Sequence, residues 1–235
     1  MAFPAAAADL RAAPITKAPA YAPAAAYNWS GFYIGGHVGG TWGDKDWTDV
    51  TFTTPFATGS HDMSGFLAGG QAGINWQVGN LVLGVEGQIS WTNADGDGTC
   101  NVGVWTCRTE ANWLGTVAGR VGYAFDRAMV YAKGGAAFIN EGYFINSVGA
   151  GTLLASTGDD TRTGWMVGGG IEWAIFDNWS AKVEYNYMDF REHSFAFHRP
   201  AGTTFGTFEV DQQMHVVKAG LNYRFNWGGQ GGVRY

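Results

Sequence analysis

Apolar and polar residues alternate one by one along much of this chain, which is the period expected of a β-strand. In the segment 32–42, FYIGGHVGGTW, the even-numbered residues are apolar and the odd-numbered residues are mixed or polar. The same alternation recurs at 66–76, 81–91, 113–123, 130–138, 165–175, 179–187 and 217–225. The pattern therefore predicts eight strands of about 9–12 residues, a length that crosses a bilayer when strands are tilted.

The two faces of these strands differ sharply in character. One face carries no charged residue and no amide, and every charge falls on the other face. A soluble barrel would bury its apolar face and hold its charges in water. Here, however, aromatic residues end the apolar face at two levels, as in the belts at the two membrane interfaces. The first level holds Trp42, Trp91, Trp113, Phe138, Trp165 and Tyr187, and the second holds Trp76, Tyr123, Trp179 and Phe225.

The polar face mixes carboxylates with basic side chains, and we expect these charges to pair inside a narrow lumen. The predicted lumen charge network consists of Glu86, Arg120, Lys133, Glu172, Lys182, Glu184, Lys218 and Arg224. Because an eight-stranded barrel is just wide enough to be filled by its side chains, a wide diffusion pore is not expected.

The connections between the predicted strands are of two kinds. Three are short turns, at 78–80, 126–127 and 177–178. The other four are long and rich in Thr, Asp, Gly and Asn, at about 43–62, 94–110, 142–162 and 192–212. Short turns at one end and long loops at the other are typical of the periplasmic and extracellular ends of outer-membrane barrels. We therefore predict an all-β fold, an eight-stranded antiparallel up-and-down transmembrane β-barrel.

Composition narrows the class of protein further. Of the 235 residues only 14% are charged, against roughly 25% in an average soluble domain. The net charge of −6, without any basic stripe, argues against binding to nucleic acid. The motif Gly-aromatic-x-x-Gly-Gly occurs three times, at 31–36, 65–70 and 164–169. It is not a phosphate loop, because no helix follows it; glycines on the lumen face leave room for larger polar side chains.

Both ends of the chain lie outside the predicted barrel, which we assign to residues 31–225. We interpret residues 1–30 as a signal-peptide remnant followed by an Ala/Pro-rich periplasmic tether, and residues 226–235 as a short tail. The Ala-rich box before Ala8 and Asp9 is typical of a signal-peptide cleavage site. Cys100 and Cys107 are expected to form a disulfide in an exported protein, the alternative being two free thiols.

Two stretches carry a family resemblance that covers essentially the whole chain. The segment YNWSGFYIGGHVGGTWG at 27–43, the tether after its Ala-Asp-Leu start, and the closing KAGLNYRF at 218–225 resemble the porin-family small outer-membrane barrels of alphaproteobacteria. That family includes the rhizobial and Brucella major outer-membrane proteins and the opacity-type surface antigens. The resemblance implies a barrel related to the transmembrane domain of OmpA.

The resemblance also implies partners for both ends. Tyr223 and Phe225 match the end of the insertion signal that the barrel-assembly machinery reads, although ten residues follow Phe225 here. Ala8 and Asp9 match the mature Ala-Asp terminus that is implicated in covalent attachment to peptidoglycan in some members.

The function expected from these features is structural. We expect a bacterial outer-membrane barrel that contacts membrane lipid and lipopolysaccharide and contributes to envelope integrity, with no cofactor and no metal. One alternative is a small-solute channel. Another is a surface protein that binds haem or another ligand through its loops; some members of the resembled family bind haem, and His193, His198 and His215 lie in or near the last long connection.

No catalytic site is expected. Ser60, His61 and Asp62 are consecutive, but neighbours in a loop do not make a triad, which needs a nucleophile and base held by a rigid shell. Asp159 and Asp160 form an acidic pair that is compatible with calcium, with cations bridging lipopolysaccharide, or with a solvated turn.

Overall fold

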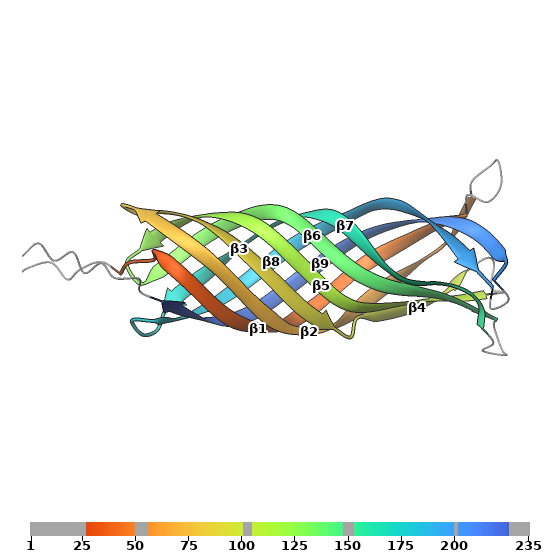
Figure 1. The fold of residues 1–235 in the computed structure, drawn as a ribbon, viewed down its shortest axis with the longest axis horizontal. Helices are drawn as coiled ribbons and strands as arrows, with labels where there is room; N and C mark the ends of the chain where they lie inside the picture. The colour runs from red at the N-terminus through yellow and green to blue at the C-terminus, as the bar shows by residue number, and fades with distance from the viewer. Residues whose placement is uncertain (1–26, 50–55, 101–104, 148–152, 200–201, 226–235) are drawn as a thin grey trace, which may run out of the picture.

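The computed structural model describes residues 27–49, 56–100, 105–147, 153–199 and 202–225. For several residues near the strand tips only the backbone is described. The described residues form nine strands of a single antiparallel sheet (Figure 1). These are β1 (Gly31–Asp49), β2 (Phe56–Val78), β3 (Leu81–Thr92), β4 (Asp95–Cys100), β5 (Trp105–Phe125), β6 (Ala128–Ser147), β7 (Leu153–Ala174), β8 (Trp179–His198) and β9 (Thr204–Phe225). In these ranges no helix is long and apolar enough to cross a membrane.

The sheet closes on itself because β1 pairs with β2 on one side and with β9 on the other. β3 and β4 act as one wall strand that is interrupted at Asn93 and Ala94, and both pair with β5. The predicted closed eight-stranded antiparallel barrel is therefore confirmed. Each predicted strand segment lies within one strand of the structure, except that Ile175 follows the last residue of β7.

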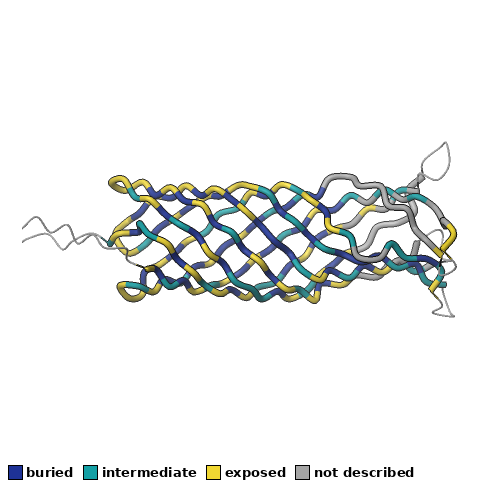
Figure 2. The backbone as a smooth tube through the Cα atoms, in the orientation of Figure 1, coloured by how far each residue is buried: buried dark blue, intermediate teal, exposed yellow. Residues whose placement is uncertain are grey.

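Buried and exposed residues alternate along the strands (Figure 2), and charged residues are among the buried ones while large apolar residues are exposed, the reverse of a water-soluble protein. In β3, Glu86 is 1% exposed, whereas Val85 and Ile89 on the other face are 48% exposed. The same inversion places Tyr33 and Arg120 inside the barrel. An apolar outer face and a charged interior suit a barrel surrounded by lipid, as the alternation predicts.

Outward-facing aromatic rings gather at two levels of the wall. At the first level Trp165 lies 5.6 Å from Tyr187, and Trp42 stacks on His215 at 5.8 Å, measured between ring centroids. At the second level Trp179 lies 5.3 Å from Tyr223. These rings mark the two interfaces between hydrocarbon and water, and we call the first level the outer belt.

The strands extend much further beyond the outer belt than the sequence predicted. Most of the segments 43–62, 94–110, 142–162 and 192–212 is strand, so the prediction of four long loops is wrong in extent. Asp, Asn and Gly have low intrinsic strand preference, but context overrides that preference when a neighbouring strand already holds the register. The short turns are confirmed, and they contain Gly79 (φ 62°) and Asp126 (φ 54°) in the left-handed region. We call the end of the barrel that carries these turns the short-turn end.

One ladder in the extended wall is incomplete. Trp165 of β7 pairs with Asp189 of β8, and the next pair that these two strands form in the described residues is Ser156 with His198. Both strands keep ladder pairs with their other neighbours over this gap. The two flanking pairs are equally far apart along both strands, so the register does not shift. Strand edges without ladder bonds are not found in contact with lipid. The edge of the hydrocarbon therefore lies at the outer belt or on the short-turn side of it.

The lipid-facing wall gives a direct test of the fold. Replacing Val85 by arginine should destabilise the barrel by about 2–4 kcal/mol, because the charge would enter the hydrocarbon near the middle of β3. The matched variant Val85→Leu keeps the site apolar and should change the free energy of unfolding by less than about 1.5 kcal/mol. Reversible unfolding in lipid vesicles measures both, and equal costs would contradict the assignment of Val85 to the lipid face.

Candidate functional site

The interior of the barrel holds the predicted charge network. β3, β5, β6 and β7 each direct one charged residue inward at this level, while β8 and β9 direct two each, because alternate residues of a strand share a face. All eight predicted side chains are at most 5% exposed, and every one lies within 4 Å of an opposite charge. They are Glu86, Arg120, Lys133, Glu172, Lys182, Glu184, Lys218 and Arg224.

Two carboxylates and three ammonium groups form the centre of this network. Lys133 Nζ lies 3.0 Å from Glu86 and 2.6 Å from Glu184. Lys182 Nζ bridges the same two carboxylates at 3.0 and 3.2 Å. Lys218 Nζ lies 3.4 Å from Glu184 and donates to Gln88. Each carboxylate therefore faces more than one cation, which offsets the cost of burying it.

A second group of charges lies nearer the short-turn end. Arg120 Nη2 donates to Glu172 at 2.8 Å, and Arg224 Nη2 lies 3.7 Å from the same carboxylate. Glu172 also accepts hydrogen bonds from Ser180 (2.6 Å) and Asn222 (3.0 Å). Glu172 therefore links both arginines to the polar wall.

Two tyrosines complete the network, and the sequence analysis missed them. Tyr33 Oη donates to Glu86 and Tyr131 Oη donates to Glu184, both at 2.8 Å. The guanidinium of Arg120 lies over the Tyr131 ring at 4.0 Å. The signal was present in the pattern, because both tyrosines occupy the polar face of their strands.

The short-turn end of the lumen is closed by the residues that precede β1. Trp29 is fully buried and packs with Val82, Ala124, Met129, Tyr131 and Ala174. Its indole Nε1 donates to the carbonyl of Asp126 at 3.0 Å, and its backbone N donates to Gln77 at 2.7 Å. The guanidinium of Arg224 lies 4.7 Å from the Trp29 ring. We call Trp29 and this apolar cluster the Trp29 plug.

Beyond the charge network, towards the outer belt, the lumen is filled by an apolar layer. Its members are buried and come from β2, β5, β6, β7, β8 and β9, together with Ala94 between β3 and β4. They are Met63, Leu67, Ala94, Ala111, Leu114, Ala118, Ala137, Ile139, Met166, Met188, Phe190, Met214 and Val216.

A separate polar cluster lies on the far side of the apolar layer. Gln212 donates to Glu141 at 3.1 Å, and Tyr143 donates to the same carboxylate at 2.7 Å. Arg162 donates to Gln212 at 3.1 Å and to the carbonyl of Phe190 at 2.7 Å. The sequence analysis missed this cluster because it ended the strands too early, although the inward face of β6 continues through Glu141 and Tyr143.

The other residues singled out in the sequence are placed as follows. Cys107 lies opposite Gly98 and Cys100 opposite Trp105 in the β4–β5 hairpin; their side chains lie outside the described part, so the disulfide stays a prediction. Tyr223 and Phe225 face outward, with ring centroids 5.0 Å apart. Ala8 and Asp9 lie outside the described residues.

The consecutive residues Ser60, His61 and Asp62 lie in β2, not in a loop. Asp62 lies opposite Asp44 of β1, and a hydrogen bond between the two raises the pKa of the Asp44 carboxyl. Asp159 and Asp160 lie in β7 opposite Gly142 and Glu141.

Histidine positions give little support to a ligand site. His215 faces outward at the outer belt, where its Nδ1 lies 2.7 Å from the hydroxyl of Tyr185. His193 and His198 lie in β8, and only their backbone is described. Among the described residues no group of three or more His, Cys, Asp or Glu side chains is arranged to hold a metal ion.

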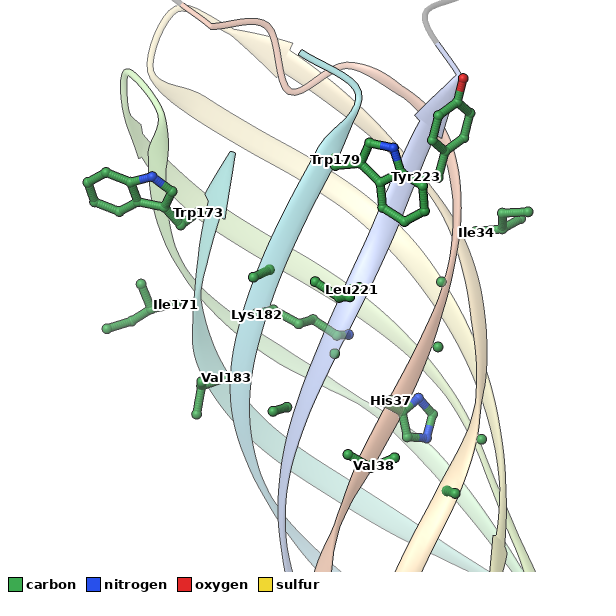
Figure 3. Close-up of a pocket in the computed structure, with 17 residues that line it drawn as sticks. Ile34, His37, Val38, Ile171, Trp173, Trp179, Lys182, Val183, Leu221 and Tyr223 are labelled. Carbon is green, nitrogen blue, oxygen red and sulfur yellow. The ribbon is translucent and has the colours of Figure 1, made fainter. Parts of the chain in front are cut away.

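The outer wall also carries a hollow of about 1230 Å³ that spans β7, β8, β9, β1 and β2. Small residues line it together with larger apolar ones: Gly36, Ala181 and Ala219 among the first, Val38 and Leu221 among the second. Figure 3 shows Ile171, Trp173 and Val183 pointing away from the wall. The lining is therefore mainly that of a lipid-facing surface.

The chain matches the family model of the outer membrane protein beta-barrel domain over residues 11–225. This chain belongs to that family. It is 34% identical over 218 residues to the 31 kDa outer-membrane immunogenic protein of Brucella melitensis, covering 89% of each chain. It is 30% identical over 202 residues to the 22 kDa outer membrane protein of Rhizobium leguminosarum, covering 84% of this chain and 79% of the relative.

Among solved structures, Neisserial surface protein A is similar with a TM-score of 0.41 and 16% identity, covering 83% of this chain and 98% of that one. The family match and the names of the relatives confirm the predicted family and the predicted location in the outer membrane. The protein is thus an outer-membrane β-barrel of this family, with a lumen filled by ion pairs and apolar side chains.

The charge network makes a prediction about stability. Glu184→Gln should destabilise the barrel by about 3–5 kcal/mol, because it removes the carboxylate that pairs with Lys218 and leaves Lys133 and Lys182 with Glu86. Glu110→Gln is the matched control, since Glu110 pairs with Arg108 where both side chains are about half exposed. The control should cost at most about 1 kcal/mol. Urea unfolding in vesicles compares the two, and similar costs would mean that water screens the lumen charges.

Proposed function

We propose that this outer-membrane barrel is a structural protein of the envelope rather than a channel or an enzyme. The observation that carries the proposal is the filled lumen, in which the Trp29 plug, the charge network and the apolar layer follow one another. A protein whose interior is packed in this way resists deformation and offers little room for a solute.

The apolar layer is the main obstacle to a solute path. Along the inward face of β9, Met214 and Val216 separate Gln212 from Lys218. Along β6, Ala137 and Ile139 lie between Lys133 and Glu141. An ion crossing this layer would have to give up its hydration for few polar partners, such as the buried hydroxyls of Thr41 and Thr116, which is costly.

The proposal also gives the N-terminal segment a mechanical role. Tyr27 lies next to the plug, where its hydroxyl donates to the carbonyl of Asp177 at 3.0 Å and accepts from Arg224 at the same distance. Tyr27, the first described residue, thus lies at the short-turn end of the barrel. Covalent attachment of Asp9 or Ala8 to peptidoglycan would connect the outer membrane to the cell wall through an anchored segment.

The names of the relatives support a role without catalysis, since they describe outer-membrane immunogenic proteins and not enzymes. A ligand-binding role has less support, because His215 already contacts Tyr185 and Trp42 at the lipid face. A small-solute channel is the second candidate, and it would need the apolar layer to rearrange.

Conductance separates the structural role from the channel. In planar bilayers the purified protein should give no steady openings above those of bilayers treated with detergent alone, because the apolar layer blocks ions. Lys218→Glu tests the lumen and Arg127→Glu, at an exposed turn, is its control. Steady wild-type openings whose ion selectivity changes in Lys218→Glu and not in Arg127→Glu would overturn the structural proposal in favour of the channel.

The tether is tested in the native host. Sacculi purified from cells that express the full precursor and digested with muramidase should yield muropeptides joined to the N-terminal peptide, as detected by mass spectrometry. Asp9→Ala alters the matched terminus and should reduce the amount of conjugate. If the wild type carries no conjugate and is released entirely by hot detergent, the attachment to peptidoglycan is ruled out and the barrel alone remains.

A further inference from the structure

The charges buried in the lumen do not balance. Among the described residues the buried acids are Glu86, Glu141, Glu172 and Glu184. The buried bases are Arg120, Lys133, Arg162, Lys182, Lys218 and Arg224. Glu141 and Arg162 both belong to the cluster beyond the apolar layer, so the excess of two positive charges falls in the charge network between that layer and the Trp29 plug.

An excess of buried positive charge is costly unless something compensates it. Removing an ion from water into a protein interior costs several kcal/mol per charge even after relaxation. Arginine does not lose its proton under ordinary conditions, so Arg120 and Arg224 stay charged. The remaining ways to balance the interior are the neutralisation of lysines or the binding of an anion.

The level next to the Trp29 plug has donors that no protein acceptor uses. Arg224 Nε and Nη2, Arg120 Nε and Asn75 Nδ2 are buried without a hydrogen-bond partner among the described residues, and so is the acceptor Asn75 Oδ1. Their residues are 1%, 4% and 1% exposed, respectively. Buried donors are nearly always paired, so several together at one level indicate that a group outside the protein accepts from them.

The three residues that carry these donors are neighbours in the lumen. The two arginines flank the same carboxylate, that of Glu172. Asn75 and Arg120 both approach Gly84, where an added Cβ would meet the Asn75 side-chain oxygen and, at 3.1 Å, the Cγ of Arg120. Arg224 borders Gly31, whose ladder partner on β2 is Asn75.

We propose that this level of the lumen binds a small inorganic anion of the halide class, chloride in the cell, held by Arg224, Arg120 and Asn75. The chemistry fits, because these groups offer N–H donors and two guanidinium charges. A halide accepts hydrogen bonds from several directions and donates none. The Trp29 plug covers the site towards the short-turn end, so the anion would be shielded from water and its attraction to the arginines would be strong.

Stability in different salts tests the proposal with the intact protein. Urea unfolding in vesicles would be compared in sodium chloride and in sodium gluconate at equal ionic strength. Binding to the folded state alone makes the unfolding equilibrium constant fall about tenfold for each tenfold rise in chloride above the dissociation constant. Gluconate is a much larger anion than chloride, and we expect it to give no such dependence.

Two variants separate the site from general salt effects. Arg224→Gln removes a ligand and one excess charge, so the dependence on chloride should disappear. Arg127→Gln removes an arginine from the same end of the barrel, but one whose side chain is 45% exposed, and it should keep the dependence. If Arg224→Gln does not refold, Asn75→Leu removes a donor without changing the charge and should weaken the dependence.

Crystals grown in sodium bromide locate the anion directly. Anomalous scattering should show bromide within hydrogen-bond distance of the Arg224 guanidinium. If bromide is found at exposed residues alone, it is an adventitious ion only, and the proposal is overturned. Equal stability in the two salts would also overturn the proposal. If the stability instead depends on pH near neutrality, neutral lysines balance the buried charge.

Discussion

The constraint on which the rest of the structure depends is the hydrocarbon around the wall. Lipid offers no hydrogen bonds, so strands that cross it must pair every backbone group with a neighbouring strand and leave no edge. The closing ladder between β1 and β2 satisfies this requirement. Because the outer face must be apolar, every charged residue of the spanning strands lies on the inward face. The ion-pair network is therefore a consequence of solvation outside the barrel as much as of attraction within it.

Much of this could be read from the sequence because a strand has a period of two residues. That period identified the eight segments, the two faces and the charged residues that share the lumen, including residues as distant as Glu86 and Lys218. It did not reveal which atoms pair, because the barrel radius, the stagger and the side-chain conformations decide that. Lys133 contacts both Glu86 and Glu184 only because β3, β6 and β8 face one another across a narrow interior.

The errors of the sequence analysis also have physical causes. Thr, Asp and Gly were interpreted as loop residues beyond the outer belt, yet ladder pairing to ordered neighbours keeps them extended. Ending the strands early concealed Glu141 and Arg162. Trp29 was assigned to a tether because local composition there is rich in Ala and Pro, whereas a tertiary contact, its burial against Val82 and Met129, fixes its position. Contacts between segments far apart in sequence leave no local pattern.

The wall beyond the outer belt is made largely of paired strands, and this determines what another macromolecule would contact at that end of the barrel. Neighbouring positions there come from distant parts of the chain: Asp44 lies between Asp62 on one side and Gln213 on the other. A surface of this kind presents side chains from several strands within the footprint of one binding site. An antibody raised against it would recognise a conformational epitope, and a linear peptide copied from a single strand would reproduce only a fraction of that epitope.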